Sequence, residues 1–327
     1  MTLPGTPPAV PDGTLPARVA RVDRTAYDVL TADGPARVAV LPEEVTVGDW
    51  LALASDGTAR LLPRTSVLVR GAASGVSRSQ PLAANVDVVM ACASLSNPLP
   101  VRRIERLLTL AWDSGATPVV VLTKADLHPE PASAVRQLLP HAPGVEVVTT
   151  SAAAGDVTAL APHAQPGTTL VLLGASGAGK STVVNALAGG PVMAVGDVRG
   201  VDGKGRHTTT HRELVVLPTG AVVIDTPGLR GVALAGTEDG LSRAFSDVED
   251  LATACRFADC AHVGEPGCAV QASVEAGDLS PARMQSWHKL QRELAFQARR
   301  TDLRLRAEER AKWKAITKSN RGRPART

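Results

Sequence analysis

Aromatic residues, cysteines and long apolar runs are all scarce in this chain of 327 residues. Phe, Trp and Tyr together make up 2% of it, and four cysteines are present. No run reaches the roughly 18 apolar residues that a membrane-spanning helix needs, so the sequence predicts no membrane partner. The N-terminal segment MTLPGTPPAVPDGTLP has neither a basic segment nor an apolar stretch, so we expect no secretory signal. Few cysteines without an export signal favour a reducing compartment, and we expect a cytoplasmic protein.

The formal net charge of +3 hides an uneven distribution. Residues 283–327 contain 14 Lys and Arg against 4 Asp and Glu, a net charge of +10. The other 282 residues carry 21 against 28, a net charge of −7. A basic C-terminal arm on an acidic body suggests a polyanionic partner, most often nucleic acid, with salt-sensitive binding. The alternative is a solvated helix with a disordered tip.

Residues 18–70 contain five or six short alternating segments, separated by Gly, Asp and Pro turns. This spacing predicts a small β-barrel, and an OB-fold is the simplest kind. Such barrels often bind RNA, but one Trp and one Tyr supply no evident stacking platform. A generic β-subdomain that only packs on its neighbour is the alternative.

Beyond the segment GAASGVSRSQ (71–80), which has the composition of a linker, apolar strands alternate with helical stretches. This alternation is typical of a parallel sheet covered by helices. The expected strands are 86–92, 119–122, 146–149, 169–173 and 221–224, and the expected helices include 101–113 and 181–187.

The pattern becomes helical and polar from about Ser242. Ser280 and Pro281 predict the start of a long helix, because Ser is a good N-cap and Pro is tolerated at the first helical position. Trp287, Leu290 and Leu294 should pack inward, which leaves the Arg-rich remainder outside.

A glycine-rich motif for binding phosphates follows the fourth predicted strand. It fits G-x-x-x-x-G-K-[ST], with a strand before it and a helix after it, and comprises Gly174, Ala175, Ser176, Gly177, Ala178, Gly179, Lys180 and Ser181. Its backbone N–H groups can wrap phosphates at the positive end of the helix. Lys180 should reach the β- and γ-phosphates, Ser181 should bind Mg²⁺, and Thr182 can hold the α-phosphate. A chance glycine turn is the alternative.

Two further segments have the composition of nucleotide-sensing switches. Asp225 ends an apolar strand and begins the sequence DTPGL, where it can hold the Mg²⁺ shell while the Gly228 N–H meets the γ-phosphate. The glycine-rich segment GKGRHTTT (203–210) offers Thr209 to complete the Mg²⁺ coordination; a bare surface turn is the alternative. Leu229 cannot orient water, so we expect slow intrinsic hydrolysis, with His207 as a candidate helper and strong activation by a partner.

Two polar turns upstream of the phosphate motif can read a guanine base. Thr123, Lys124 and Asp126 form the first, in which Asp126 can accept hydrogen bonds from guanine N1–H and the exocyclic amine. Ser151 and Ala152 belong to the second, where a backbone N–H can donate to guanine O6. Each follows a predicted strand, so the turns should meet at one edge of the sheet. Since base-reading turns usually follow the phosphate loop, this order predicts a circularly permuted GTPase that binds GTP and GDP; closely spaced chain ends permit such a cut.

Three cysteines and a histidine occur within fourteen residues. They are Cys255, Cys260, His262 and Cys268. Three thiolates and an imidazole make a closed tetrahedral site, so we expect one structural Zn²⁺. A disulfide with a spare thiol, or ordinary buried cysteines, are the alternatives. Cys92 lies on an apolar strand and should belong to the core.

With these motifs in this order, the sequence resembles the ribosome small subunit-dependent GTPase A family. The resemblance covers nearly the whole chain, through LAANVDVV, TKAD, GASGAGKST, GRHTTT, DTPGL and CRFADCAHVGEPGCAV. It implies an OB-fold barrel, a permuted GTPase domain and a zinc-bearing helical domain. It also implies GTP hydrolysis stimulated by the small ribosomal subunit during late maturation, with binding to its rRNA. The family generally has Asn where this chain has Thr123, which predicts somewhat weaker affinity with guanine preference kept.

The expected architecture is a multidomain α/β protein, which we expect to be a monomer. Its predicted divisions are a loose tail (1–16), the barrel (17–72), a linker (73–81), the GTPase domain (82–235), the zinc-binding helical domain (236–318) and a basic tail (319–327). A non-hydrolytic RNA-binding scaffold with a vestigial nucleotide site is the main alternative function. An ATP-using P-loop enzyme is a third hypothesis, which Asp126 disfavours.

Overall fold

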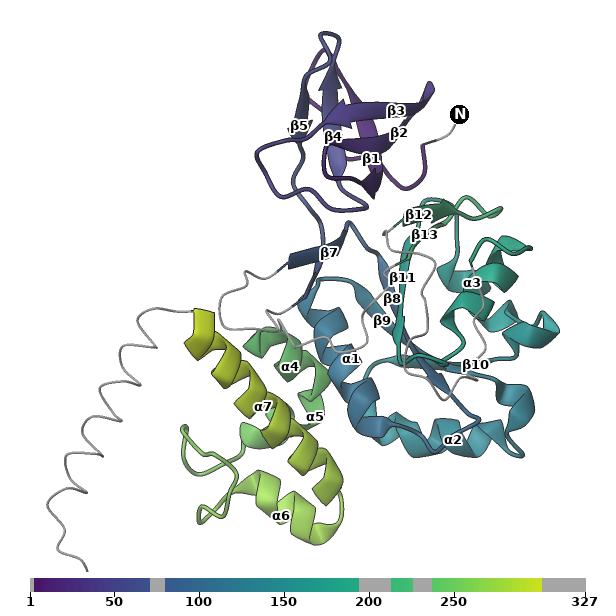
Figure 1. Ribbon diagram of the computed structural model, residues 1–327. Helices are drawn as coiled ribbons and strands as arrows, with labels where there is room; N and C mark the ends of the chain where they lie inside the picture. Colours follow the sequence, from purple (N-terminus) through teal and green to yellow (C-terminus); the bar gives the residue numbers. More distant parts are fainter. Residues whose placement is uncertain (1–2, 71–79, 194–212, 226–236, 302–327) are drawn as a thin grey trace, which may run out of the picture.

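The computed structural model in Figure 1 describes residues 3–70, 80–193, 213–225 and 237–301. An N-terminal antiparallel sheet, a mixed sheet with flanking helices and a C-terminal group of helices follow one another along the chain. Three predicted site residues, His207, Thr209 and Gly228, lie outside the described residues, as do Leu229, the basic tail 319–327 and most of the predicted linker.

Five antiparallel strands form the N-terminal sheet, in the order β3-β2-β1-β4-β5. They are β1 (Thr14–Val22), β2 (Ala26–Thr31), β3 (Gly34–Ala39), β4 (Trp50–Ala54) and β5 (Ala59–Leu61). Alternate apolar side chains, among them Val19, Tyr27 and Leu51, form its core. The predicted β-rich region is therefore confirmed. The sixth segment, β6 (Val67–Arg70), pairs instead with β7 (Gln80–Ala84), so Gln80 and Pro81, which the composition assigns to the linker, begin a strand.

The larger sheet continues in the order β10-β9-β8-β11-β13-β12. Its strands are β8 (Val88–Ser94), β9 (Thr117–Thr123), β10 (Glu146–Thr150), β11 (Thr169–Gly174), β12 (Glu213–Val216) and β13 (Val222–Asp225). All the neighbours are parallel except β12, which runs antiparallel to β13. The five predicted strands are confirmed, and β12 is an addition.

Helices cover both faces of this sheet, as a parallel sheet requires. The helices of this region are α1 (Val101–Asp113), α2 (Pro131–Leu138) and α3 (Lys180–Ala188). Alternate strand residues such as Val120 and Leu122 pack with α1 and α2, whereas Val119 and Val121 pack with α3 and a short 3₁₀ helix (Thr158–His163). Because strand side chains alternate between faces, one apolar run supplies two cores.

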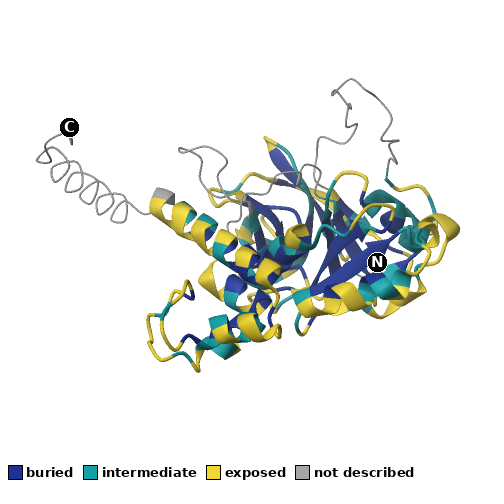
Figure 2. Cartoon of the chain, turned by 90° about the horizontal axis from the view of Figure 1, so that it is seen from below, coloured by how far each residue is buried: buried dark blue, intermediate teal, exposed yellow. Residues whose placement is uncertain are grey.

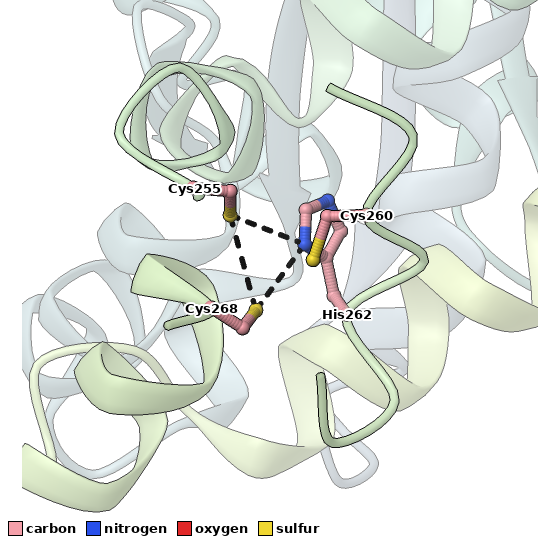
Figure 3. A group of neighbouring side chains, drawn as sticks. All are labelled: Cys255, Cys260, His262 and Cys268. Carbon is pink, nitrogen blue, oxygen red and sulfur yellow. Dashed lines mark hydrogen bonds between the residues drawn. The ribbon is translucent and has the colours of Figure 1, made fainter. Parts of the chain in front are cut away.

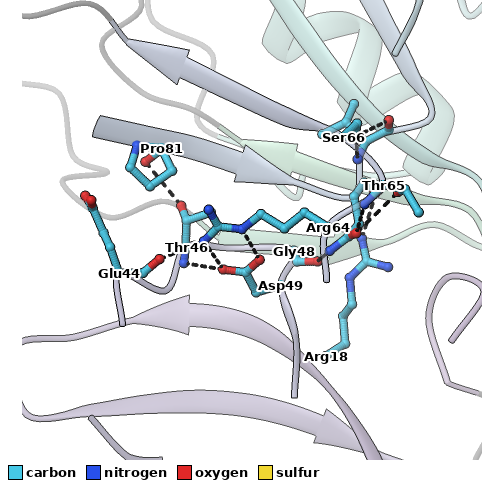
Figure 4. A network of polar contacts seen from close by, with 11 residues as sticks. Arg18, Glu44, Thr46, Gly48, Asp49, Arg64, Thr65, Ser66 and Pro81 are labelled. Carbon is cyan, nitrogen blue, oxygen red and sulfur yellow. Dashed lines mark hydrogen bonds and ion pairs between the residues drawn. The ribbon is translucent and has the colours of Figure 1, made fainter. Parts of the chain in front are cut away.

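A buried polar network joins the N-terminal sheet to the larger sheet (Figure 4). Arg18 is 1% exposed and donates to the Asn85 carbonyl (3.1 Å) and to Thr169 Oγ1 (3.0 Å), while its guanidinium lies over the Trp50 ring. Burial lowers the pKa of Arg18 to about 10. Arg64 holds the fully buried Asp49 through two hydrogen bonds of 2.7 and 2.8 Å. Arg18 thus links the N-terminal strands to the larger sheet, which they also join directly where β1 pairs with β12. The Arg64–Asp49 pair holds the N-terminal region itself together.

The described C-terminal part is helical. It contains α4 (Glu238–Ala244), α5 (Ser246–Ala252), α6 (Ala269–Ala276) and α7 (Pro281–Thr301). The predicted start of α7 is confirmed, and Trp287, Leu290 and Leu294 are buried as expected, which gives the helix one inward and one exposed face (Figure 2). Among the described residues, no helix is long and apolar enough to span a membrane.

Arg283 ties this helical part to the larger sheet domain. Its side chain is 1% exposed and forms two hydrogen bonds with Asp247, at 3.0 and 2.7 Å. It also donates to Glu105 Oε1 of α1 (3.0 Å) and to the His141 carbonyl (3.1 Å). One guanidinium thus connects α7, α5 and α1.

Candidate functional site

The predicted phosphate loop connects the carboxyl end of β11 to the N-terminus of α3. Gly174 has a φ of 154°, and a Cβ there would lie 2.4 Å from the Cys92 carbonyl oxygen. Gly177 and Gly179 each have a φ of 78°. A side chain is strained or excluded at these positions, so glycine is required for the backbone to turn this way. The loop precedes a helix N-terminus, where backbone N–H groups can bind phosphate oxygens.

Lys180, the first residue of α3, and Asp225, the last residue of β13, are near enough for their charges to interact. Lys180 Nζ donates to the carbonyl oxygens of Gly174 (3.0 Å) and Ala175 (2.8 Å), so this side chain folds over the loop. Partial burial raises the pKa of Asp225, although the nearby charge of Lys180 acts in the opposite direction. A cation and a carboxylate therefore border the loop, as binding of a phosphate group with its divalent cation demands. Ser181 and Thr182 follow in the first turn of α3.

Glu213 is a residue near the site that the sequence analysis missed. It is the first residue of β12 and pairs in register with Asp225. Its negative charge contributes to the raised pKa of Asp225. The signal in the sequence is weak, because only the short apolar segment LVVL follows Glu213 before a turn.

The first base-reading turn follows β9 directly. Thr123, the last residue of that strand, is 2% exposed and donates through Oγ1 to the Ala178 carbonyl of the phosphate loop (2.9 Å). Lys124 adopts a left-handed conformation with a φ of 57°, and Asp126 lies in a short 3₁₀ helix (Ala125–Leu127). The base-reading turn and the phosphate loop, about fifty residues apart in the chain, are thus joined by a hydrogen bond.

The second turn follows β10, the neighbouring parallel strand. Ser151 Oγ accepts a hydrogen bond from the Asp126 backbone N–H (3.1 Å). Ala152 begins a 3₁₀ helix (Ala152–Ala154) that packs against α3. The structure therefore brings the residues predicted to read the base, Thr123, Lys124, Asp126, Ser151 and Ala152, together with the phosphate loop, as the permuted order requires.

Cys255, Cys260, His262 and Cys268 converge in a separate group between α5 and α6 (Figure 3). Their potential ligand atoms all lie within 4.8 Å of one another. Cys255 Sγ lies 3.9 Å from Cys268 Sγ, and His262 Nδ1 lies 3.6 and 3.4 Å from these two sulfurs. Burial lowers the pKa of His262, which favours the neutral imidazole that a metal needs.

The distances among the ligand atoms of Cys255, His262 and Cys268 match a tetrahedral zinc site, and Cys260 Sγ lies within 4.8 Å of them. With Zn–S bonds of about 2.3 Å and a Zn–N bond of about 2.0–2.1 Å, tetrahedral geometry places sulfurs about 3.8 Å apart and sulfur about 3.6 Å from nitrogen. The four residues therefore form a Cys₃His group with the chemistry and spacing of a structural metal site.

Two residues that the sequence analysis missed order the loop around this group. Gln271 Nε2 donates to the His262 carbonyl (2.6 Å), and Gln271 N donates to Cys268 Sγ (3.4 Å). Glu265 accepts backbone N–H bonds from Ala261, Val263 and Gly264, and such backbone bonds lower its pKa to about 2. Hydrogen bonding around a ligand set orients the ligands, so both residues belong to the functional unit.

The sheet order, the phosphate loop and the position of the two polar turns define a class of protein. It is a P-loop GTPase in which the turns predicted to read the base precede the phosphate loop, that is, a circularly permuted GTPase. A model of the RsgA GTPase family matches residues 61–235. The chain belongs to this family and is a GTPase.

Relatives along nearly the full length support this assignment. The small ribosomal subunit biogenesis GTPase RsgA of Streptomyces coelicolor is 48% identical over 321 residues, covering 94% of this chain and 88% of the relative. The protein of the same name from Opitutus terrae is 45% identical over 345 residues, covering 97% and 93%.

Solved structures agree with the fold. YjeQ from Thermotoga maritima has a TM-score of 0.65 at 25% identity, covering 86% of this chain and 98% of that one. YloQ, described as a circularly permuted GTPase, has a TM-score of 0.63 at 24% identity and covers 86% and 96%; at this identity it supports the fold alone.

Proposed function

We propose that this chain hydrolyses GTP in response to the small ribosomal subunit and acts as a late maturation factor that binds its rRNA. Relatives along most of the chain are named small ribosomal subunit biogenesis GTPases. The hydrogen bond from Thr123 to the Ala178 carbonyl carries the proposal, because it joins the turn in which we expect guanine recognition to the glycine-rich loop.

The described residues support separate roles in binding the nucleotide. Asp126 accepts from the guanine N1–H and amine, and the Lys124 stem lies against the purine face. Lys180 leaves its two carbonyl partners for the β- and γ-phosphates, a move that a flexible side chain can make within its reach. Ser181 would bind Mg²⁺ directly, and Asp225 would hold the water shell of the ion. The positive charge of the ion would offset the cost of burying the Asp225 carboxylate.

Three further residues complete the proposed catalytic set from the sequence alone. Thr209 coordinates Mg²⁺, the Gly228 N–H contacts the γ-phosphate, and His207 helps to position water. Leu229 stands where a side chain could orient the attacking water. The ribosomal partner therefore supplies this function and raises the rate of GTP hydrolysis by roughly 10³–10⁵.

The other parts of the chain position this enzyme on RNA. Zn²⁺ in the Cys₃His group holds the C-terminal helices together, and the N-terminal sheet acts as an OB-fold barrel. Tyr27 and Trp50 of that sheet are buried, at 3% and 2% exposure, so its RNA contacts use charge and shape instead of stacked bases. The domain limits proposed from the sequence, a monomeric state and a cytoplasmic location complete the proposal.

GTP favours docking of the barrel and zinc domain on rRNA, and hydrolysis releases them. The permutation joins the second switch segment directly to α4, so a loop that senses γ-phosphate is covalently connected to the zinc-bearing helices. Binding of the GDP and non-hydrolysable GTP forms to purified small subunits tests this step. Equal affinities would contradict it.

Phosphate release with and without purified small subunits tests the main proposal. We expect multiple turnovers with strong stimulation by subunits, and loss of at least about a hundredfold in Lys180→Ala, because a preorganised charge on the transferred group is removed. Arg136→Gln, on the exposed surface of α2, is the control and should behave as wild type. Stoichiometric subunit binding without turnover would instead favour the non-hydrolytic scaffold.

A further inference from the structure

A cleft of about 510 Å³ lies at the junction of α1, α7 and the metal-binding loop. It is lined by Arg102, Val263, Gln285, His288, Lys289 and Arg292. Three of these residues carry a permanent positive charge, a fourth is a histidine, and none is acidic. The cleft is thus a concentrated positive site on a chain whose first 282 residues are net negative.

The spacing of residues on α7 explains why the charges gather here. Gln285, His288, Lys289 and Arg292 recur at intervals of three and four, so they share one face of the helix. Met284, Trp287, Leu290 and Leu294 occupy the buried face. The helix therefore anchors itself by its apolar side and presents a basic stripe beside it.

Contacts between α1 and α7 hold the cleft in a fixed shape. Arg102 donates to Gln285 Oε1 (2.9 Å), and Arg106 pairs with Glu293 (2.5 Å). Arg283 donates a hydrogen bond to Glu105 in the same junction. Glu293 is thus engaged by Arg106, Glu105 by Arg283 and His141, and Glu265 by backbone N–H groups of its own loop. Among the described residues, no acidic side chain lines the cleft beside Arg102, Lys289 and Arg292.

The lining indicates the chemistry of that anion. Arg and Lys side chains bind phosphate oxygens, and Val263, which is 74% exposed, together with the aliphatic stems can contact sugar. The lining has no Phe, Tyr or Trp on which a base could stack and no carboxylate to accept from a base. Such a site would contact the backbone of a nucleic acid and have little sequence specificity.

We propose that this cleft binds the sugar–phosphate backbone of RNA, through Arg102, Lys289 and Arg292. The inference rests on the proposed function, since it assigns the rRNA contact to a surface formed jointly by the GTPase domain and the zinc-bearing helices. Because the two walls come from α1 and α7, the site exists only while those helices are packed together.

Salt-dependent binding to naked small-subunit rRNA tests the cleft. Loss of one phosphate contact lowers the slope of log affinity against log salt by about 0.7–0.9, which is roughly a five- to eightfold loss of affinity at about 0.1 M salt. We expect this loss in Arg292→Gln, and about twice the change in slope in Lys289→Gln/Arg292→Gln. Arg136→Gln removes one charge from the exposed surface of α2 and should retain the wild-type slope.

The outcomes separate this inference from the proposed function. Equal salt slopes for wild type, Arg292→Gln and the double variant would refute the proposed role of the cleft in binding RNA, even if subunits stimulate GTP hydrolysis normally. No binding of wild type to naked rRNA would overturn it as well. A reduced slope in the variants with no stimulation of wild type by intact subunits would support the cleft and contradict the proposed function. Zinc content and thermal unfolding of each variant show whether it is folded.

Discussion

The nucleotide site and the metal cluster of this protein are assembled in opposite ways. The nucleotide residues come from the ends of β9, β10, β11 and β13, between Thr123 and Asp225, and they meet because these strands are neighbours in one sheet. The four cluster residues lie within one short segment, from Cys255 to Cys268. One site depends on long-range strand register, and the other depends on a local loop and the metal ion proposed above.

This contrast explains why the chain tolerates a reordered GTPase. Parallel strands bring their carboxyl ends to the same edge whatever their order along the chain, so the pocket survives a change of connectivity. The cluster has no such freedom, because its loop has few buried apolar side chains of its own and its ligands are close in sequence. We expect loss of the cluster to disturb only the residues around it. A change at the nucleotide site should also disturb the pairing of neighbouring strands.

Removal of the metal should produce the largest effect. Structural zinc contributes on the order of 10 kcal/mol to folding of small zinc-binding units, so chelation or Cys268→Ala should unfold the segment around the cluster. Limited proteolysis should cut near residues 253–279, while GTP binding persists. Cys92→Ala, which changes a cysteine outside the cluster, should retain one zinc per chain. Unchanged protease resistance after complete metal removal would show that the cluster is not structural.

Loss of Arg283 should be next, because it connects the two regions. Arg283→Met removes the guanidinium that binds the buried Glu105 and Asp247, although His141 Nδ1 stays 2.8 Å from Glu105 Oε1. Breaking a buried pair costs up to about 3–5 kcal/mol, and the remaining contact should reduce this. Urea unfolding followed by tryptophan fluorescence measures the loss. Lys289→Met, on the exposed face of the same helix, should change stability by less than about 0.5 kcal/mol. Equal midpoints for the two variants would contradict the role of Arg283 as the joint.

Asp126→Ala should reduce the preference for GTP over ATP. Two hydrogen bonds to a charged carboxylate are lost, each worth about 1.5–3 kcal/mol, so discrimination should fall by at least about a hundredfold. Competition binding with both nucleotides gives the ratio. Glu130→Ala removes a nearby exposed acidic side chain and should keep the preference. If Asp126→Ala binds GTP as wild type does, and ATP binds equally well, the base assignment is wrong.

Thr123→Val should give the smallest effect and tests how the two nucleotide loops are joined. The valine keeps the shape but loses the hydrogen bond to the Ala178 carbonyl, which is worth about 1 kcal/mol, so GTP affinity should fall several-fold with guanine preference kept. Thr123→Asn, the residue general in the family, should bind GTP somewhat more tightly than wild type. Thr117→Val, at the exposed start of the same strand, is the control. A Thr123→Val affinity equal to that of the control would mean that the hydroxyl does not support the loop.

Much of this arrangement could be predicted from the sequence because its signals are local. The phosphate motif, the strand-ending turns and the cysteine spacing each carry their own chemistry, and the order of the turns revealed the permutation. The start of α7 followed from Ser280 and Pro281, and its buried face followed from the spacing of Trp287, Leu290 and Leu294.

The missed features are those that depend on partners far away in the chain. β6 reads as another strand of the N-terminal sheet, but its partner is β7, in a segment that begins within a linker-like composition. Glu213 and Arg283 look like ordinary surface charges until the sheet places one beside Asp225 and the helices bury the other. Periodicity gives the type of an element, whereas pairing between distant elements is decided by the whole fold.

The pairing of β1 with β12, at Arg21 and Glu213, has a consequence for how the protein can be divided. Strand β12 is the last strand of the nucleotide-binding sheet, and β1 occupies its outer side. An uncovered last strand presents free backbone donors and acceptors to any other chain, which is a common start of aggregation. The N-terminal sheet therefore covers part of this edge, at the pairing of Arg21 with Glu213, and a fragment cut after residue 70 would expose it.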